Sequence, residues 1–344
     1  MKRTTWCKVL VAFAFTVAAG LAPAQNVKVT PLGTHTGELC GRDRATIFED
    51  PTGVRILYDA GQSLTGADDP RLADVHVVLL SHAHSDHIGD QKLAEINAGT
   101  CAQPKLVAAG ANSVTAEIIA EKNSAMMIVR ELGLFIDKRV ATLRGKPSVA
   151  CAQSAGSTTV PLAAPCLAVV ELGGSQLFKT SAATRSVEIT VVQAAHASNP
   201  PRSMLTDAGK ASLVADEFAA NVGPATGYVI TFTNGLRVYL SGDTALHTEM
   251  RTVVRDFHKA NLAVMNLGPN AISPQAAAYA MNELVRPATV IASHPNEGVT
   301  SSGKLIPNTR TATFINLVKG RAVYPALSGR TMEFDGNAKC VAGC

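Results

Sequence analysis

The chain has 344 residues, of which 47% are hydrophobic and 17% charged, and its formal net charge is +4 at pH 7. This composition can bury a substantial core, as one large domain or two small ones, and it excludes a largely disordered chain. Aromatic residues make up only 5% of the chain, and the single tryptophan, Trp6, lies near the N-terminus. Stacking surfaces for bases are therefore sparse, and we expect no nucleic-acid partner.

The first 24 residues have the features of a secretory signal peptide. Lys2, Arg3 and Lys8 supply a positively charged start, and Val9 to Ala22 is apolar and rich in small residues. Ala22-Pro23-Ala24 then forms a small-x-small cleavage pattern, so we expect a periplasmic or secreted mature protein. The alternative is a retained membrane anchor, which needs a longer apolar run of about 18 residues.

Removal of this leader changes the charge balance. It takes away three positive charges and no negative ones, so the formal net charge falls from +4 to +1. A near-neutral chain has no general electrostatic attraction to phosphate polymers or anionic membranes. We therefore expect a small-molecule substrate and no membrane association after cleavage.

Six cysteines remain after the leader, an even number in an oxidising compartment, and disulfides are expected. They allow about 15 complete pairings, and closeness in sequence favours Cys151 with Cys166 and Cys340 with Cys344. A catalytic cysteine or a zinc-thiolate site is the alternative, but the sequence has no CxxC pair. The other two cysteines are Cys40 and Cys101.

Short strand-like runs bounded by Gly, Pro or Asp alternate with helical segments along the rest of the chain. Strands are predicted at Val27–Pro31, Thr46–Glu49, Val54–Tyr58, Val75–Leu80, Val187–Gln193, Gly227–Thr233, Leu236–Leu240, Leu262–Asn266, Val290–Ser293, Ala322–Tyr324 and Thr331–Phe334. Helices are predicted at Asn112–Glu121, from the N-cap Ser273 to Leu284, and at Asn308–Lys319. This order suggests two packed sheets with helices outside.

The stretch from Ala98 to Arg185 is less regular than the rest. It contains an apolar patch at Met126 to Leu134, followed by segments rich in Ala, Ser and Thr that hold two cysteines. We expect residues 25–344 to form one domain in which about 98–185 is an inserted or elaborated region.

The segment Ser81-His82-Ala83-His84-Ser85-Asp86-His87 carries the strongest chemical signal. It places three imidazoles and a carboxylate within six residues, directly after the apolar run Val75–Leu80. Imidazole and carboxylate suit zinc, iron and related divalent ions. Two ions about 3.5 to 4 Å apart need more ligands than this loop supplies, including a bridging group, so further ligands must come from distant residues.

The pattern His-x-His-x-Asp-His followed by Gly89 resembles the signature of the metallo-β-lactamase superfamily. Downstream, His196, Asp243 and His294 each follow a predicted strand, in the order of that family's ligands. The resemblance covers most of Val27 to Phe334. It implies an α/β fold, an αββα sandwich of two mixed β-sheets with helices on the outer faces.

The same resemblance implies a ligand set. His82, His84 and His196 would bind the first metal, Asp86, His87 and His294 would bind the second, and Asp243 would bridge the two. The cofactors expected are two divalent ions, zinc first, with iron or manganese as alternatives.

Within the superfamily the C-terminal half resembles the lactonase-like metal-dependent hydrolases. Gly242-Asp243-Thr244, Ser273 to Ala277 and Ser293-His294-Pro295 carry this likeness. Pro31-Leu32-Gly33-Thr34 is instead similar to the arylsulfatase and tRNA-processing branch.

The function implied is hydrolysis of an ester, lactone or cyclic amide by a metal-bridging hydroxide, because two cations lower the pKa of a shared water toward about 7. Asp86 is the candidate catalytic group that orients this water or carries its proton. The alternatives are a phosphodiesterase or arylsulfatase-like hydrolase on the same two-metal centre, and a metal-binding protein without hydrolytic activity.

Overall fold

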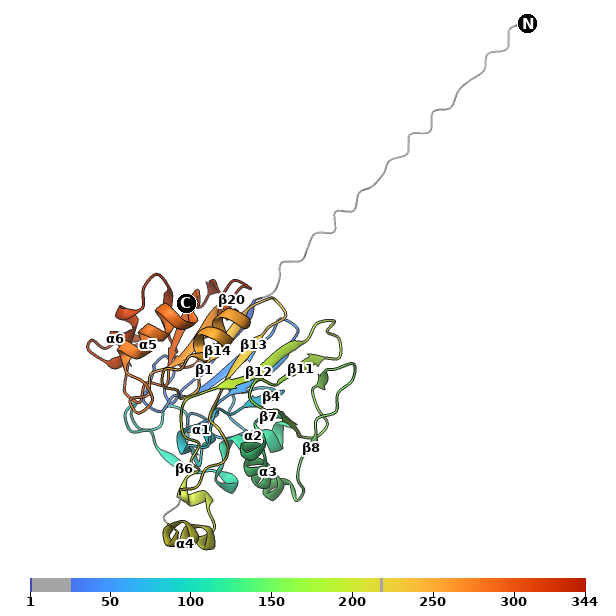
Figure 1. Ribbon diagram of the computed structural model, residues 1–344, viewed down its shortest axis with the longest axis vertical. Helices are drawn as coiled ribbons and strands as arrows, with labels where there is room; N and C mark the ends of the chain where they lie inside the picture. Colours follow the sequence, from blue (N-terminus) through green and yellow to red (C-terminus); the bar gives the residue numbers. More distant parts are fainter. Residues whose placement is uncertain (2–25, 217–218) are drawn as a thin grey trace.

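The computed structural model describes residues 26–216 and 219–344, together with Met1. The predicted signal peptide therefore lies outside the described residues, apart from its first residue. Two β-sheets face each other and helices cover their outer faces (Figure 1), which confirms the predicted αββα sandwich. None of the described helices has the length and apolar character needed to cross a bilayer.

The first sheet has nine strands and mixes parallel with antiparallel pairs. In spatial order they are β21 (Cys340–Ala342), β20 (Met332–Phe334), β1 (Val27–Leu32), β2 (Ala45–Glu49), β3 (Arg55–Tyr58), β4 (Val77–Leu79), β7 (Ala125–Ile128), β10 (Cys166–Val169) and β8 (Val149–Ala150).

The second sheet has eight strands. In spatial order they are β19 (Ala322–Pro325), β16 (Thr289–Ser293), β15 (Leu262–Asn266), β14 (Arg237–Leu240), β13 (Thr226–Thr231), β12 (Val187–Gln193), β11 (Ser175–Thr180) and β9 (Thr158–Val160). Two small hairpins lie apart from both sheets, β5 (Gln91–Leu93) with β6 (Leu106–Ala108) and β17 (Thr300–Ser301) with β18 (Lys304–Leu305).

Side-chain alternation explains how the second sheet is buried on both faces. In β14, Val238 and Leu240 pack into the core between the sheets, whereas Tyr239 points to the helices on the other side. Successive strand residues point to opposite faces, so a continuous apolar run serves both layers. The strands predicted for the second sheet, from Val187–Gln193 to Ala322–Tyr324, are confirmed to within two residues at each end.

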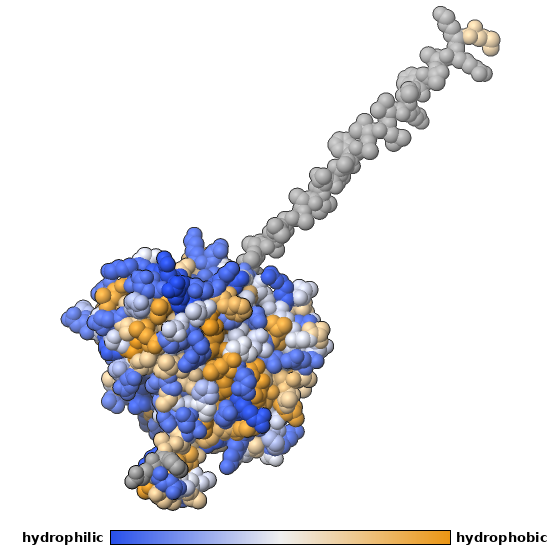
Figure 2. Space-filling view, in the orientation of Figure 1, coloured by the Kyte–Doolittle hydropathy of each residue, from blue (hydrophilic) through white to orange (hydrophobic). Residues whose placement is uncertain are grey.

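Most of the described helices form the two outer layers of the sandwich. They are α1 (Ser85–Ile88), η1 (Gly110–Asn112), α2 (Val114–Lys122), α3 (Arg130–Arg144), η2 (Arg202–Met204), α4 (Asp207–Ala215), η3 (Met250–Phe257), α5 (Pro274–Tyr279), η4 (Ala280–Val285) and α6 (Arg310–Leu317). α2 and α3 lie over the first sheet, and η3, α5, η4 and α6 cover the second. α4 projects from the body as a small knob (Figures 1 and 2).

N-cap side chains define several helix starts. Ser113, Ser273 and Thr309 each accept a hydrogen bond from a backbone N–H of the first helical turn. The predicted Ser273 cap is therefore confirmed. The helix that follows continues to Val285, but its second half is a wider π-helical segment.

Residues 98–185, expected to be an inserted or elaborated region, contribute strands to both sheets. β7, β8 and β10 extend the first sheet and β9 and β11 extend the second. The apolar patch predicted at Met126 to Leu134 is divided between β7 and the start of α3.

The six cysteines of the described chain lie in three pairs. The Cα atoms are 5.4 Å apart for Cys40 and Cys101, 4.8 Å for Cys151 and Cys166, and 6.3 Å for Cys340 and Cys344. These separations fit disulfide bonds. The two pairs favoured from the sequence are among them, and their oxidation stays a prediction that depends on the compartment.

Asp50 joins the two sheets. It lies after β2, is 1% exposed, and accepts hydrogen bonds from the backbone N–H and hydroxyl of Thr233 after β13, and from Thr52.

We expect Asp50→Ala to lower the free energy of unfolding by about 3 kcal/mol, because several buried hydrogen-bond donors then lose their acceptor. Urea unfolding measures this. The neighbouring Glu49→Ala is the control, and an equal loss in both variants would contradict the role of Asp50.

Candidate metal centre

Every predicted ligand follows the carboxyl end of a strand. β3 and β4 are parallel neighbours in the first sheet, and β14, β15 and β16 are parallel neighbours in the second. β12 runs in the same direction as β14, because each is antiparallel to β13. Parallel strands end on the same side of a sheet. The loops that follow β12, β14 and β16 therefore start on one side of the second sheet, as the loops after β3 and β4 do in the first sheet.

Hydrogen bonds between the sheets hold these strand ends against each other. The backbone N–H and hydroxyl of Thr226 donate to Ser81 O at 2.8 and 3.0 Å. The N–H of Gly242 donates to the Tyr58 hydroxyl at 3.1 Å. Gly242 has a φ of +58°, and a Cβ there would overlap with Thr226 O, so this close approach requires glycine.

The histidine motif forms a turn followed by the one-turn helix α1. His82 and His84 precede the helix, whereas Asp86 and His87 lie within it. Gly89 ends the helix at a φ of +72°. This change of backbone direction divides the side chains of the motif into two groups.

Three imidazoles form the first group of candidate ligands. His82, His84 and His196 each offer a ring nitrogen, and these atoms lie within 4.8 Å of one another. His82 Nε2 is 2.9 Å from His84 Nδ1, and the His196 ring lies edge-on to both rings. We call this set the three-histidine subsite.

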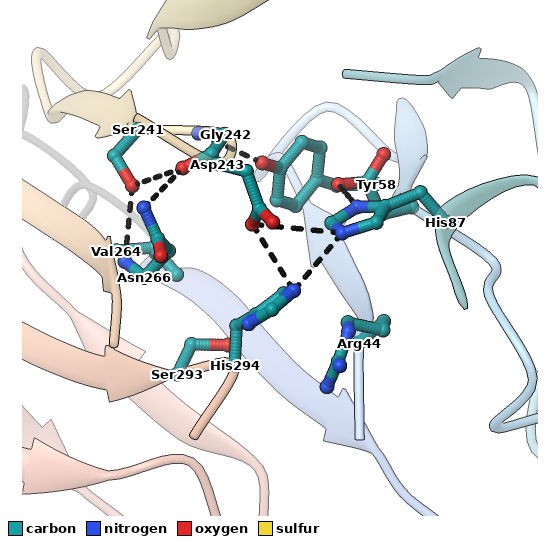
Figure 3. A pocket seen from close by; sticks show the side chains of 11 residues that line it. Arg44, Tyr58, His87, Ser241, Gly242, Asp243, Val264, Asn266, Ser293 and His294 are labelled. Atoms are coloured by element: carbon teal, nitrogen blue, oxygen red, sulfur yellow. Dashed lines mark hydrogen bonds and ion pairs between the residues drawn. The ribbon is translucent and has the colours of Figure 1, made fainter. Parts of the chain in front are cut away.

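Asp86, His87 and His294 form the second group. His87 Nε2 lies 3.0 Å from His294 Nε2, and Asp86 Oδ2 lies 3.5 Å from His294 Nε2 and 3.8 Å from His87 Nε2. We call this set the Asp86 subsite. Figure 3 shows His87 and His294 pointing toward each other across the cavity.

Asp243 lies between the two groups. Its Oδ1 is 3.0 Å from His294 Nε2 and 3.5 Å from His87 Nε2, and its Oδ2 is 3.7 Å from His196 Nε2. The structure therefore brings all seven predicted ligands into one cluster, with the carboxylate of Asp243 facing both subsites.

Hydrogen bonds join the loop that carries His196 to the loop that carries Asp243. Ala195 N donates to the Thr244 hydroxyl at 2.9 Å, and Ala245 N donates to Ala195 O at 3.2 Å. The amide of Asn266, at the end of β15, donates to Gly242 O at 2.7 Å. Both ligands are thus positioned by backbone that has hydrogen-bond partners.

Asp59 and Ser81 fix the protons on two of the imidazoles. Ser81 Oγ donates to Asp59 Oδ2 at 2.8 Å, so it accepts from His82 Nδ1 at 2.9 Å. Asp59 Oδ2 also accepts from His87 Nδ1 at 2.8 Å. With the proton of each neutral ring on Nδ1, the lone pairs of both Nε2 atoms point into the cluster. This is how an outer carboxylate orients metal-binding histidines.

Three residues around the site have left-handed backbone that side chains rarely adopt. The φ angles are +43° at Asp59, +51° at His294 and +52° at Asn296. Such conformations cost about 1 kcal/mol or more each and gather at functional sites. They turn the chain sharply at the strand ends, where the side chains enter the cluster.

The carboxylates and imidazoles change one another's protonation. Burial lowers the pKa of His87, but Asp243, Asp59 and Asp86 outweigh it and raise that pKa to about 10. Burial also raises the pKa of Asp243, but His294 and His87 hold it well below its usual range. For His82 and His294 burial dominates and lowers the pKa. Without metal, the His87 ring therefore carries a second proton and a positive charge at pH 7, whereas the rings of His82 and His294 stay neutral.

The donor set fits divalent metal ions. Two facing ring nitrogens, such as those of His87 and His294, can share only one proton, whereas both can bind metal. Asp243 Oδ1 and His294 Nδ1 are buried, and each has no hydrogen-bond partner in the described part of the chain. Imidazole and carboxylate ligands are those that zinc prefers.

Two groups that the sequence reasoning did not identify complete the site. Asp59 follows β3, so its place at a strand end was an available signal. Arg44, which forms an ion pair with Asp86 at 2.8 Å, comes from the segment before β2, and no local pattern marked it.

The chain belongs to the beta-lactamase superfamily domain family, whose sequence profile matches residues 54–294. This range includes all seven candidate ligands and the ends of the strands that carry the site, β3, β4, β12, β14, β15 and β16. The family resemblance predicted from the sequence is therefore confirmed.

Curated relatives of the chain are described as metal-dependent hydrolases. A metal-dependent hydrolase of Polynucleobacter asymbioticus is 30% identical over 43% of this chain, a match that spans 48% of that relative. A metal-dependent hydrolase of Koribacter versatilis is 24% identical over 78% of this chain and 84% of the relative. The chain thus spans about half the length of the first relative and most of the second.

Among solved structures, a metallo hydrolase from the hyperthermophilic archaeon Ignicoccus hospitalis is similar in fold. It is 21% identical, the TM-score is 0.53, and the match covers 90% of this chain and 99% of the other. At this identity the likeness concerns the fold.

Loss of the Asp59 carboxylate tests the outer layer of the site. We expect Asp59→Asn to weaken zinc binding by about 10- to 100-fold, because Ser81, His82 and His87 lose the group that orients them. Competition with a chromogenic chelator measures the affinity. Asp207→Asn on the exposed helix α4 is the matched control. Unchanged zinc affinity in Asp59→Asn with an intact fold would contradict this role.

Metal binding should release a proton from His87. Its raised pKa of about 10 means that the ring is protonated at pH 7 without metal. A metal at Nε2 must displace that proton, so affinity should fall as the pH falls, by roughly tenfold per unit below that pKa. Calorimetric titration in buffers of different ionisation enthalpy counts the protons. We expect about one more proton released at pH 7 than at pH 10.5; equal release would argue against a protonated His87.

Proposed function

We propose that the protein is a metal-dependent hydrolase that opens an ester, lactone or cyclic amide bond in a small molecule, with two divalent ions, zinc first, in the cluster. The observation that supports it is the position of Asp243, whose two oxygens face different subsites. A carboxylate in this place can bridge two ions.

The ions, when bound, would activate water near neutral pH and stabilise negative charge on the attacked carbonyl oxygen. The residues of the chain would hold the ions and orient the ligand side chains. Asp59 sets the ring orientation of His87, and Asp243 with His294 completes the ligand set across the gap between the sheets.

Asp86 has a narrower role than the sequence suggested. Burial raises its pKa, but His87, Arg44 and His294 outweigh burial and lower the pKa far below the usual carboxyl range. A carboxylate that is so reluctant to accept a proton is a poor general base. We infer that Asp86 orients groups in the site rather than carrying a proton from water.

The charges next to the candidate ligands favour a carbonyl substrate over a phosphodiester. In the described part of the chain, Arg44 is the one lysine or arginine that forms a hydrogen bond or ion pair with a candidate ligand. Its guanidinium hydrogens are already used within the chain. Binding a phosphate group benefits from free cationic donors, and Arg44 offers none.

Turnover of a substrate panel tests this function. Lactones, β-lactams, aryl esters and bis-aryl phosphodiesters are compared with and without chelator, followed by readdition of zinc. We expect hydrolysis of a carbonyl substrate that chelation abolishes and zinc restores. Asp243→Asn should lower kcat/KM by about 100-fold or more, because it removes the bridging charge.

Asp207→Asn is again the control and should keep wild-type turnover. Cleavage of phosphodiesters alone would favour the phosphodiesterase alternative. Turnover that survives complete metal removal would refute the metal-dependent mechanism proposed for this cluster.

A further inference from the structure

A cavity of about 280 Å³ lies between α3 and the segment that leads into α4, at the end of the molecule that carries the α4 knob (Figure 1). The described side chains that line it include two cations, Lys138 and Arg139, and no aspartate or glutamate. None of the seven candidate metal ligands is among them. The cavity is therefore a positively charged space separate from the metal centre.

Three contacts hold the guanidinium of Arg139 at the wall of this cavity. Nη1 donates to Phe135 O at 2.5 Å, and Nη2 donates to Met204 O at 2.9 Å. The guanidinium carbon also lies 3.7 Å from the centre of the Phe135 ring, which is a cation–π contact. The two hydrogen bonds use two of the five guanidinium hydrogens, and the other three have no acceptor in the described part of the chain. Arg139 therefore keeps donors for a ligand.

No acidic group offsets the charge of Arg139. The side chain is half-buried, and burial alone lowers its pKa to about 10. A nearby carboxylate would favour the charged form and oppose that change. Lys138 likewise forms no ion pair within the described ranges. An unpaired cation in a partly buried position is costly, and a bound anion would lower this cost.

Two carboxylates adjoin this cavity without lining it. Asp207 is fully exposed and pairs with Lys210 at 3.0 Å. Asp90, which lies 3.5 Å from the Ser203 hydroxyl, accepts a hydrogen bond from the Gln62 amide at 2.9 Å. Neither carboxylate forms an ion pair with the two cations of the cavity, so these charges have no counter-charge among the described residues.

The start of α4 supplies a further donor. Thr206 is the N-cap of this nine-residue helix and lines the cavity, and its hydroxyl oxygen accepts from Gly209 N at 3.1 Å. The hydroxyl hydrogen has no acceptor in the chain as described, so it can donate to a ligand. The N-terminal end of a helix also carries a partial positive charge. Positive charge thus reaches the cavity from both α3 and α4.

We propose that this cavity, which we call the α3–α4 anion site, binds a small oxyanion with two negative charges, of the class of inorganic phosphate and phosphate monoesters. Lys138 and Arg139 supply two positive charges, which match those of a dianion. The planar guanidinium can donate parallel hydrogen bonds to two oxygens of such a group. Binding at this site requires no metal ion.

A purely structural role of Arg139 is the competing explanation. Its hydrogen bond to Met204 O joins α3 to η2, and this link alone could account for the residue. That explanation gives no role to Lys138, whose exposed side chain has no hydrogen bond or ion pair within the described chain. Phosphate affinity that depends on Lys138 therefore separates the two explanations.

Isothermal titration calorimetry with inorganic phosphate tests the site. The metal-free protein is titrated first, so that phosphate at the metal centre does not contribute to the heat. We expect one phosphate ion per chain with a Kd of about 1 mM or lower, and the same step in the zinc-loaded protein. Lys138→Gln should weaken binding by about tenfold, because it removes one of the two charges. Lys138→Glu should abolish it.

Arg139→Gln should weaken phosphate binding by about tenfold or more, because it removes the guanidinium donors together with the charge. Circular dichroism and thermal unfolding show whether this variant is folded. If it does not fold, the two Lys138 variants still test the site, since that side chain has no partner in the described chain that folding could require.

Arg130→Gln is the matched control. Arg130 is exposed, does not line the cavity and lies at the start of α3, about 13 Å from Arg139 along the helix axis. The substitution removes the same charge from the same helix. Phosphate affinity should stay within about twofold of the wild type, because solvent and salt screen an exposed charge at this distance.

Phenyl phosphate distinguishes an esterified ligand from a free one. Tighter binding of phenyl phosphate than of inorganic phosphate would indicate a monoester, and the reverse order would indicate free phosphate. Lys138→Glu should abolish the binding of both.

A wild-type chain that binds no phosphate below about 10 mM would overturn the proposal. Phosphate binding that occurs only in the zinc-loaded protein, or that persists in Lys138→Glu, would also overturn it. An equal loss of affinity in Arg130→Gln and Lys138→Gln would do the same, because it would show a general effect of charge rather than a site.

Discussion

The buried carboxylate of Asp59 is the constraint on which the metal centre depends. It accepts from the backbone N–H and hydroxyl of Ser81 and from the His87 ring, so it fixes the first residue of the histidine motif and one of its ligands together. A buried carboxylate without such partners would be costly, and here both oxygens accept hydrogen bonds. The same hydrogen bonds of Asp59 therefore orient the ligands and stabilise the ends of β3 and β4.

Much of this site could be predicted from the sequence because each ligand follows an apolar run of strand length. Val187–Gln193 and Leu262–Asn266 were predicted with their observed bounds. The fifteen-residue helix α3 was missed, because Met126 to Leu134 was interpreted as one apolar patch although Arg130 and Glu131 interrupt it. The helical spacing of the buried residues Leu132, Ile136 and Val140 was an available signal. Arg44 and Asn296 were beyond prediction, since their pairing depends on chain segments 252 residues apart.

Asp86 illustrates why a ligand list does not define a mechanism. The motif shows that a carboxylate follows two histidines, and it says nothing of what else that carboxylate contacts. In the fold, its Oδ2 accepts a hydrogen bond from Arg44 and also lies 3.5 Å from His294 Nε2. The same residue type in the same motif can therefore act as a ligand, as an orienting group or as a proton carrier, according to the loops that surround it.

The left-handed backbone at Asp59, His294 and Asn296 has a consequence for how the site is assembled. Residues held in such conformations persist only where the surrounding structure leaves them no alternative. Here β3 and β16 continue into the sheets on one side, and hydrogen bonds fix the loops on the other. The sharp turns at these three residues are thus set by the strands and hydrogen bonds of the chain itself, so the fold determines the direction in which His294 and Asp59 enter the cluster.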